Sequence, residues 1–228
     1  MTDDEQAQLG RAVSTLTEDC MHTAGYASWN SPPELPKVGS KTLTDLRYGI
    51  HDAALVAKRG YHPDAAEKAA HDAAVEAAVA ARPGGATVSA EKNCGQQGKQ
   101  KIGDAQAGFQ LAEQLANRAF TKAKQEPDVA AAFAQWSGCM KESGYTYREP
   151  LDAVDNPKFG RDVTKEEIDT AVADLKCRGR SNVALVWYEA EVRLQKADLE
   201  MNAQALQDGR AKLDSAMENV NAALAGKR

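Results

Sequence analysis

The sequence has no run of about 20 consecutive apolar residues, the length that a helix needs to cross a lipid bilayer, and so it predicts no transmembrane segment. Aromatic residues are also scarce, at 6% of the chain, and the formal net charge is −5. Lysine and arginine alternate with acidic residues along almost the whole chain, whereas binding to a nucleic-acid backbone needs them clustered. These features indicate a well-solvated protein with thin structural elements and argue against nucleic acid as its main partner.

The common catalytic and cofactor motifs are missing as well. There is no G-x-S-x-G elbow, no P-loop and no G-x-G-x-x-G fingerprint. The histidines have neither the H-x3-H nor the H-E-x-x-H spacing of a metal site; they are His22, His51, His62 and His71. We therefore expect no catalytic residue, no bound metal and no cofactor.

Some acidic residues lie close enough in sequence to be considered as paired carboxylates for acid–base catalysis. They are Glu166, Glu167, Asp169 and Asp174. Thr164, three positions before Glu167, completes the pattern of a helix capping box, and acidic residues in a first helical turn complement the helix dipole. The positions of these residues fit helix stability and solubility, which we favour over catalysis.

A short phrase, C-M-x-x-x-G-Y, occurs twice, beginning at Cys20 and at Cys139. Each copy stands at the end of a run of residues with periodic apolar positions. Each is followed by one further cysteine, Cys94 or Cys177, so all the cysteines belong to two copies of the same pattern. The repeat predicts two structural disulfides, Cys20–Cys94 and Cys139–Cys177, each joining a pair of helices.

Other uses of cysteine fit the sequence less well. A zinc site typically has C-x2-4-C pairs, but at least 37 residues separate any two cysteines here. Arg178 and Arg180 flank Cys177 and could activate its thiol, which leaves a reactive cysteine as an alternative. The pairing Cys20–Cys139 is a further alternative if the two repeats pack face to face.

The cysteines and the N-terminus indicate different compartments. Disulfides persist in oxidising environments outside the cytoplasm, yet the first residues, MTDDE, lack the basic and apolar regions of a signal peptide. We resolve this conflict in favour of the disulfides. The protein is expected to be extracytoplasmic, either secreted or membrane-anchored through an export segment absent from this chain.

The first repeat is expected to contain several helices and a long connection. Apolar spacing predicts an amphipathic helix over 3–24, with Gly25 suited to its C-terminal cap. A proline-rich connection follows over 30–40. An alanine-rich helix is expected over 64–82, and another helical run over 96–125, although glycines weaken the prediction of its first half.

The second repeat is clearer. A helix is expected to begin near Pro127 and to end at Gly144, and the capping pattern starts another helix that leads to the last cysteine. We therefore expect the chain to divide into a first repeat at 1–126 and a second repeat, with a long C-terminal helix, at 127–228. Both are expected to pack as one compact unit.

The last expected element is the longest, a helix over 183–224. Apolar residues fall seven positions apart along it, which is typical of coiled-coil-like packing. They are Leu185, Val192, Leu199, Leu206, Leu213 and Val220. Such a stripe needs a partner surface, so we expect its far end, near Met217 and Leu224, either to cover the alanine-rich helix, which we favour, or to contact another molecule. The chain would then be a monomer or a weak dimer through this helix.

Aromatic residues supply the candidate binding residues. Tyr48 and Tyr61 stand beside glycines in the segments LRYG and RGYHP, a pattern typical of anchors that hold a long connection on a helical body. Trp187 and Tyr188 are candidates for a sugar-stacking platform. For Trp187 we favour a core position beside the second disulfide, because Trp136 occupies the matching position of the partner helix.

Several stretches together resemble a group of uncharacterised exported actinobacterial proteins, many of them predicted lipoproteins. They are the C-M-x-x-x-G-Y phrase, LRYG with the later RGYHP, WSGCMKESGYTYREPLDA, and CRGRSNVALVWYEAE. The resemblance covers nearly the whole chain and is most specific over 136–191. It implies an extracytoplasmic location and disulfide bonding, and it assigns no activity.

The expected fold is all-α, with two disulfide-stapled helical repeats, proline-rich connections and a long coiled-coil-like C-terminal helix. The expected function is that of a non-catalytic extracytoplasmic binding or structural module of the bacterial cell envelope, with an unidentified envelope component or protein as partner. An envelope-acting enzyme, or an inhibitor of one, is the alternative. An enzyme should show polar groups with perturbed pKa values converging in a pocket, whereas a binding module should show an exposed apolar or aromatic stripe.

Overall fold

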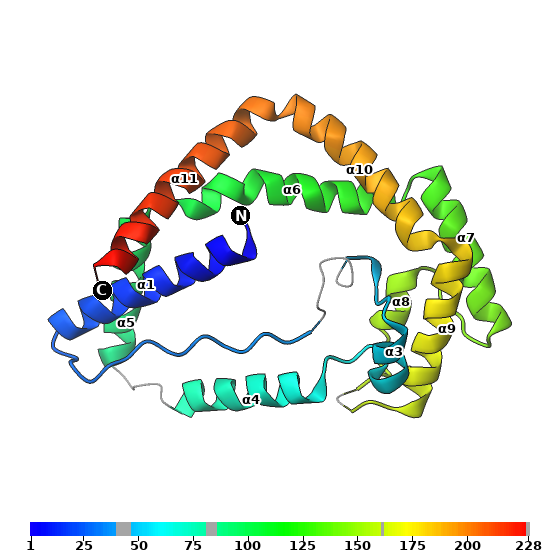
Figure 1. Cartoon of the computed structure of the whole chain (residues 1–228), viewed down its shortest axis with the longest axis horizontal. Helices are drawn as coiled ribbons and strands as arrows, with labels where there is room; N and C mark the ends of the chain where they lie inside the picture. The colour runs from blue at the N-terminus through cyan, green and yellow to red at the C-terminus, as the bar shows by residue number, and fades with distance from the viewer. Residues whose placement is uncertain (40–46, 81–85, 161, 227–228) are drawn as a thin grey trace. The chain divides into compact units, whose positions relative to one another are not determined.

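A computed structural model describes residues 1–39, 47–80, 86–160 and 162–226, and these residues form helices without any strand (Figure 1). The all-α prediction is therefore confirmed. Both predicted disulfides are present, Cys20–Cys94 and Cys139–Cys177, each with its Cα atoms 5.5 Å apart.

The chain divides into two compact units, and each unit holds one disulfide-bonded repeat. The first unit consists of Met1–Leu35, Ala74–Ala116 and Asp198–Arg228, and the second of Pro36–Ala73 and Asn117–Ala197. This division differs from a single boundary at 126, because the chain passes from one unit to the other several times.

The first unit is built on helix α1 (Asp3–Thr23), which begins with a capping box between Thr2 and Glu5. Helices α5 (Ala86–Ile102) and α11 (Ala203–Ala225) both pack against α1. Their shared core consists of small and aliphatic side chains, with no aromatic residue among those described; its buried members are Ala12, Ile102, Ala105, Leu213, Ala216 and Val220.

Glycine has a packing role in α5. A Cβ atom added to Gly98 would lie 3.4 Å from the Cβ of Leu16 and from the carbonyl oxygen of Val13. The glycine therefore lets α5 approach α1 closely near the disulfide. Gly103 has a different role: its φ of +95° ends α5, and α6 (Ala105–Ala123) begins two residues later. The single helix predicted over 96–125 is thus two helices, because glycine adopts this backbone conformation without steric penalty.

The repeated phrase C-M-x-x-x-G-Y has the same local structure in both units. Gly25 and Gly144 have φ values of +94° and +89° directly after helices α1 and α7 (Pro127–Glu142). The N–H of the following tyrosine donates to the carbonyl of the methionine, at 3.0 Å in the first copy and 2.9 Å in the second. This is the Schellman arrangement of a helix C-terminus. The methionines, Met21 and Met140, are both fully buried.

In the second unit, helix α7 packs against α9 (Lys165–Ser181), and the short helices α3 (Ala53–Arg59) and α8 (Pro150–Val154) also contact α9. The core includes part of α10 (Val183–Met201) and contains both fully buried tryptophans, Trp136 and Trp187. The alanine-rich helix α4 (Ala65–Ala80) has no buried residue.

The C-terminal helical region is long, but Asn202 interrupts it between α10 and the 23 residues of α11. On α11, Leu213 and Val220 of the predicted stripe are buried. On α10, Leu185 and Leu199 are 47% and 52% exposed. The prediction of a continuous packed stripe is therefore wrong for α10.

A different face of α10 is buried, and it carries Val183, Trp187 and Ala190. The volume of the tryptophan selects this face, since burying one indole removes more apolar surface from water than burying a leucine does. The far end of the C-terminal helix packs on α1 and α5. The expectation that it covers the alanine-rich helix is wrong.

Candidate binding groove on helix α7

A buried carboxylate, that of Glu191, holds residues 47–49 of the LRYG segment in the second unit; Leu46 lies outside the described residues. Glu191 of α10 is 2% exposed and accepts hydrogen bonds from the Tyr48 hydroxyl at 2.6 Å and from Arg47 Nε at 2.9 Å. Burial raises the pKa of Tyr48 well above its usual range, and the hydrogen bond to Glu191 raises it further. Gly49 has a φ of +93°, and an added Cβ would lie 2.5 Å from the guanidinium of Arg178. The tyrosine and the glycine are thus both structural.

The RGYHP segment is held by Glu167 in the same way. The Tyr61 N–H donates to Glu167 Oε1 at 2.8 Å, and His62 Nδ1 lies 2.7 Å from the same oxygen. The other ring nitrogen of His62 lies 2.9 Å from the Gly160 carbonyl oxygen. Both ring nitrogens of His62 therefore lie within hydrogen-bond distance of an oxygen, and these two contacts fix the orientation of the imidazole. An added Cβ on Gly60 would lie 2.7 Å from Glu167 Oε1, so this position also requires glycine.

Asp174 is the centre of the most deeply buried network. Its Oδ1 accepts from the Trp136 indole at 2.8 Å and from Arg178 Nε at 2.7 Å, and its Oδ2 accepts from the Tyr61 hydroxyl at 3.0 Å. Arg178 also donates to the carbonyls of Tyr48 and Pro150. Burial and the negative charge of Asp174 raise the pKa of Tyr61.

The acidic residues of α9 therefore differ from the sequence interpretation. Glu167 and Asp174 are 0% and 2% exposed, so they do not serve solubility. Thr164 does cap the helix by accepting the Glu167 N–H at 3.2 Å, but the Glu167 carboxylate binds Tyr61 and His62. A carboxylate within reach of several buried donors binds them because an unpaired donor is costly to bury.

The predicted binding residues lie in different environments. Trp187 is 1% exposed and stacks on Phe120 with ring centroids 4.7 Å apart, so it is a core residue and offers no platform to a ligand. Tyr48 is 6% exposed and likewise belongs to the core. Tyr61 is partly buried and stacks on Phe159. Tyr188 alone of these candidates has an exposed ring, at 50%.

No group of three or more His, Cys, Asp or Glu side chains in the described part of the chain is arranged to hold a metal ion. All the cysteines are in disulfides. None of the described helices combines the length and the apolar character needed to cross a membrane.

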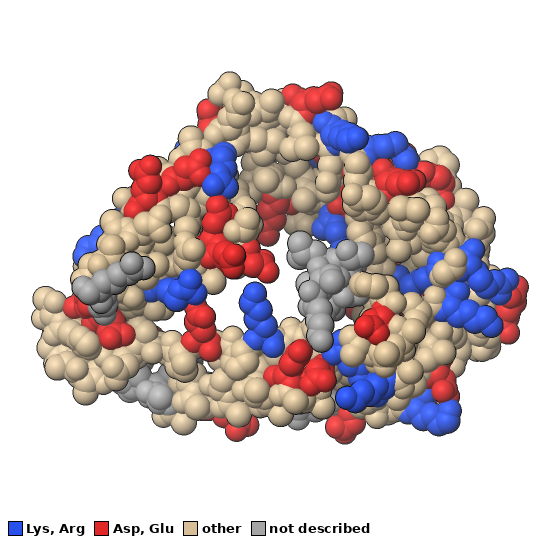
Figure 2. Space-filling view, in the orientation of Figure 1, with Lys and Arg blue, Asp and Glu red and all other residues tan. Residues whose placement is uncertain are grey.

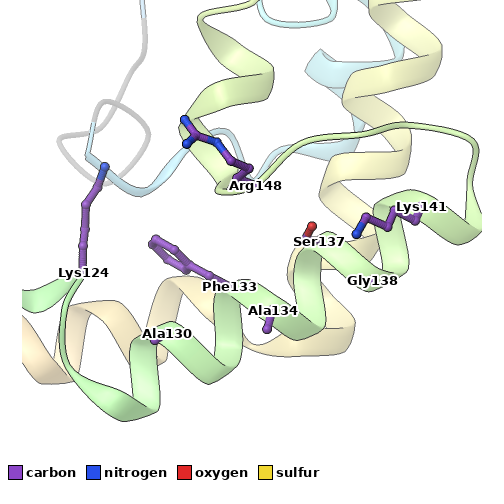
Figure 3. Close-up of a pocket in the computed structure, with 8 residues that line it drawn as sticks. All are labelled: Lys124, Ala130, Phe133, Ala134, Ser137, Gly138, Lys141 and Arg148. Atoms are coloured by element: carbon purple, nitrogen blue, oxygen red, sulfur yellow. The ribbon is translucent and has the colours of Figure 1, made fainter.

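A groove of about 470 Å³ runs along the outer side of α7 (Figure 3). Its floor consists of Ala130, Ala134 and Gly138, which are exposed and follow one another at four-residue spacing, one helical turn apart. Phe133 contributes the edge of a ring that is 8% exposed. The Ser137 hydroxyl lines the groove but donates to the Tyr147 carbonyl at 2.6 Å.

Basic side chains border this floor: Lys124 before α7, Lys141 near its C-terminus and Arg148 in the following loop. Lys124 Nζ donates to Glu149 at 2.7 Å and lies 5.5 Å from the centre of the Trp187 ring, so its position is fixed. No carboxylate lines the groove.

The other two cations face solvent. Arg148 has a side chain that is 91% exposed and only a long contact, 3.6 Å, with Asp152. Lys141 is exposed and forms an ion pair with none of the described residues. On the visible face in Figure 2, Lys and Arg side chains gather over the region of α7 and α9 and alternate with acidic ones elsewhere. The lining of the groove thus contains three cations and no carboxylate, in a chain with a net charge of −5.

A second pocket, of about 540 Å³, lies beside the Tyr145–Tyr147 segment. Asn156 Nδ2 donates to the Tyr147 hydroxyl at 2.8 Å, and burial raises the pKa of that tyrosine. Of the pocket's two carboxylates, Asp152 accepts the N–H groups of Arg148 and Glu149 at the start of α8, and Glu166 is exposed. Lys158 also lines this pocket, so it presents charges of both signs, whereas the groove is lined by cations alone.

The groove is not evident in the sequence, because its cations lie far apart in the chain. Lys124 and Arg148 are 24 positions apart, with acidic residues among those between them. The only local signal is the four-residue spacing of Ala130, Ala134 and Gly138.

Comparison with known proteins adds no assignment: no family model matches the chain, and neither a curated protein nor a solved structure matches it.

Proposed function

We propose that this protein is a non-catalytic extracytoplasmic module of the bacterial cell envelope that binds an envelope component or a protein partner. The observation that carries the proposal is the presence of one disulfide in each compact unit. Structural disulfides are stable in oxidising compartments and rare in the cytoplasm. The resemblance to exported actinobacterial proteins, secreted or lipid-anchored, supports the same compartment.

The environments of the ionisable groups favour binding over catalysis. The tyrosines with the most strongly raised pKa values, Tyr48 and Tyr61, donate to carboxylates inside the second unit. An enzyme would be expected to place such groups in a pocket open to substrate. Neither Tyr48 nor Tyr61 lines the groove on α7 or the pocket beside it. An envelope-acting enzyme or inhibitor is therefore the weaker alternative.

Weak self-association is a second part of the proposal. On α10, Leu185 and Tyr188 are 47% and 50% exposed, and Val192 of the same seven-residue stripe is partly exposed. Glu189 and Lys196 are exposed beside the stripe, so two antiparallel copies would bring each glutamate near a lysine of the partner. Leu185→Glu should turn such a dimer into a monomer in light scattering without loss of stability.

The compartment is tested directly in cells of the source organism. Free thiols are alkylated before lysis, and the protein is then located by fractionation and examined for modified cysteines. We expect it in the envelope or the medium with no alkylated cysteine. Recovery of the protein in the cytoplasm with free thiols would overturn the proposal.

A further inference from the structure

We propose that the groove on α7 binds a linear chain of phosphodiester-linked units that carries no nucleobases. This ligand class rests on the proposed function as an envelope binding module and names the chemistry that the module recognises.

The charge of the groove selects an anion. Lys141 and Arg148 face solvent at its border, Lys124 lines it as well, and its lining includes no carboxylate. The whole chain has a net charge of −5, so a polyanion needs a local cluster of cations to bind. Arginine and lysine both bind phosphate oxygens through charge-assisted hydrogen bonds.

The shape of the groove selects an elongated ligand. Ala130 and Lys141 both line it and are 11 residues apart on α7, which corresponds to roughly 16 Å along a helix. Alanine methyl groups and a glycine form the floor, and the Phe133 ring stands to one side of it, so a chain can lie along the small residues. A single phosphate ion would contact only one part of this length.

The groove suits a peptide poorly. Its floor is the side of a helix, whose backbone N–H and C=O groups are bonded within the helix, and its one hydroxyl, that of Ser137, already donates to Tyr147. An extended peptide would therefore lose water without gaining backbone partners. A helical partner would need apolar surface to bury, and the floor offers only alanine, glycine and the edge of Phe133.

A single-stranded nucleic acid also fits poorly, because its bases stack on exposed aromatic rings. The only aromatic residue that lines the groove, Phe133, is 8% exposed. A phosphodiester chain with polyol units needs cations and a smooth floor, and these are what the groove provides.

The test uses the full oxidised chain and fluorescently labelled poly(glycerol phosphate) as the probe. Binding is measured by anisotropy over a range of salt concentrations. For the two solvent-facing cations we expect the logarithm of the affinity to fall with the logarithm of salt with a slope near −1.4, since each phosphate contact contributes about −0.7. Lys141→Ala and Arg148→Ala should each reduce the slope by about 0.7 and weaken binding about tenfold at low salt.

Three control variants distinguish binding in the groove from attraction by the charge of the whole protein. Lys212→Ala removes an exposed lysine from α11 in the first unit and should leave the affinity unchanged. Gly138→Glu places a charge on the floor, where an added Cβ meets no atom within 4 Å, so the variant should fold and lose binding. Gly138→Gln, of the same size, should bind more tightly than Gly138→Glu.

Each other outcome overturns the inference. No binding of the polymer does so, as does an equal loss in Lys212→Ala. Equal or tighter binding to phosphatidylglycerol vesicles would indicate a lipid headgroup instead, and equal binding to poly-glutamate would indicate an acidic protein. Any of these results would leave the compartment test standing, because that test depends on the cysteines and not on α7.

Discussion

The two units contain the same disulfide-bonded helix-end motif in different surroundings. Each has a helix that ends in C-M-x-x-x-G-Y, a fully buried methionine, a glycine with positive φ and a disulfide to a later helix. In the first unit the surrounding core consists of alanine, valine, leucine and isoleucine, and Cys20 is partly exposed. The second unit surrounds the motif with two tryptophans and buried ion pairs.

This difference indicates how each unit is stabilised. Large aromatic side chains bury more apolar surface than alanine does, and each fully buried one contributes a few kcal/mol. We therefore expect the core of the second unit to hold its helices together without its disulfide, and the first unit, with its thin core, to depend on the covalent bond. The same motif would then be essential in one unit and supplementary in the other.

The largest expected effect comes from removing each disulfide separately. Each bond should contribute about 4 kcal/mol, because the closed loops contain 74 and 38 residues by sequence separation. We expect Cys20→Ser with Cys94→Ser to unfold the first unit, as measured by loss of helical circular dichroism. Tryptophan fluorescence should still report a folded second unit, where Trp136 and Trp187 are buried.

The matched variant, Cys139→Ser with Cys177→Ser, should keep both units folded at a lower melting temperature. If both double variants lose the same amount of helix, the comparison between the units is wrong. An unchanged melting temperature in reductant, with free thiols confirmed, would mean that packing alone holds both.

The next largest effect should come from Asp174→Ala in the second unit. The change leaves Arg178 without its charge partner. Breaking a buried ion pair in this way lowers the free energy of unfolding by roughly 3–5 kcal/mol. We expect about 3 kcal/mol, because Arg178 keeps its bonds to two carbonyls. Urea unfolding followed by tryptophan fluorescence measures the loss.

Asp214→Ala in the first unit is the control for this variant. Asp214 pairs with Arg210 one turn away, and both side chains are about half exposed, at 53% and 54%. An exposed pair of this kind contributes less than about 0.5 kcal/mol. A loss as large as that of Asp174→Ala would show that burial does not decide the value of these ion pairs.

Leu213→Ala should have a smaller effect, confined to the first unit. Leu213 is 1% exposed between α11 and its neighbours, so truncation should cost about 2–3 kcal/mol. Leu199→Ala, in the same seven-residue stripe but 52% exposed, should cost less than about 0.5 kcal/mol. Thermal unfolding measures both, and light scattering should give an unchanged mass for Leu213→Ala. A change of mass would place Leu213 in an interface between molecules.

The smallest expected changes in stability come from replacing single glycines by alanine, one in each unit. Gly60→Ala forces a side chain into a backbone with φ of +59° and against Glu167, and should destabilise the second unit by about 1–2 kcal/mol. Gly10→Ala, in helix α1 with open space around it, should stabilise the first unit by about 0.5–1 kcal/mol. Equal shifts in melting temperature would contradict the role assigned to Gly60.

The local features were accessible to sequence analysis because they depend on neighbouring residues. Gly25 and Gly144 mark helix ends by their freedom to adopt positive φ, and Thr164 caps α9 through a residue three positions away. The duplicated phrase also predicted the cysteine pairing correctly, since each copy had one later cysteine to bind.

The choice between competing faces and partners was decided by tertiary structure. The seven-residue spacing predicted that Leu185 and Leu199 lie on a packed stripe. In the structure these leucines are exposed, and the face of α10 that carries Trp187 is buried instead. The spacing of Glu167 and Asp174 fits a solvated helix equally well, and it is the docking of the RGYHP segment that brings buried donors to both carboxylates.

The same holds for the candidate site. Lys124, Lys141 and Arg148 are separated in the sequence by acidic residues, and the fold brings them to the border of one groove. The sequence by itself determined the all-helical fold, the helix ends at Gly25 and Gly144 and the two disulfides, because backbone preference, capping and a repeated motif act over a few residues. Tertiary structure alone decided which side chains are buried and which charges gather, because these depend on contacts between segments distant along the chain.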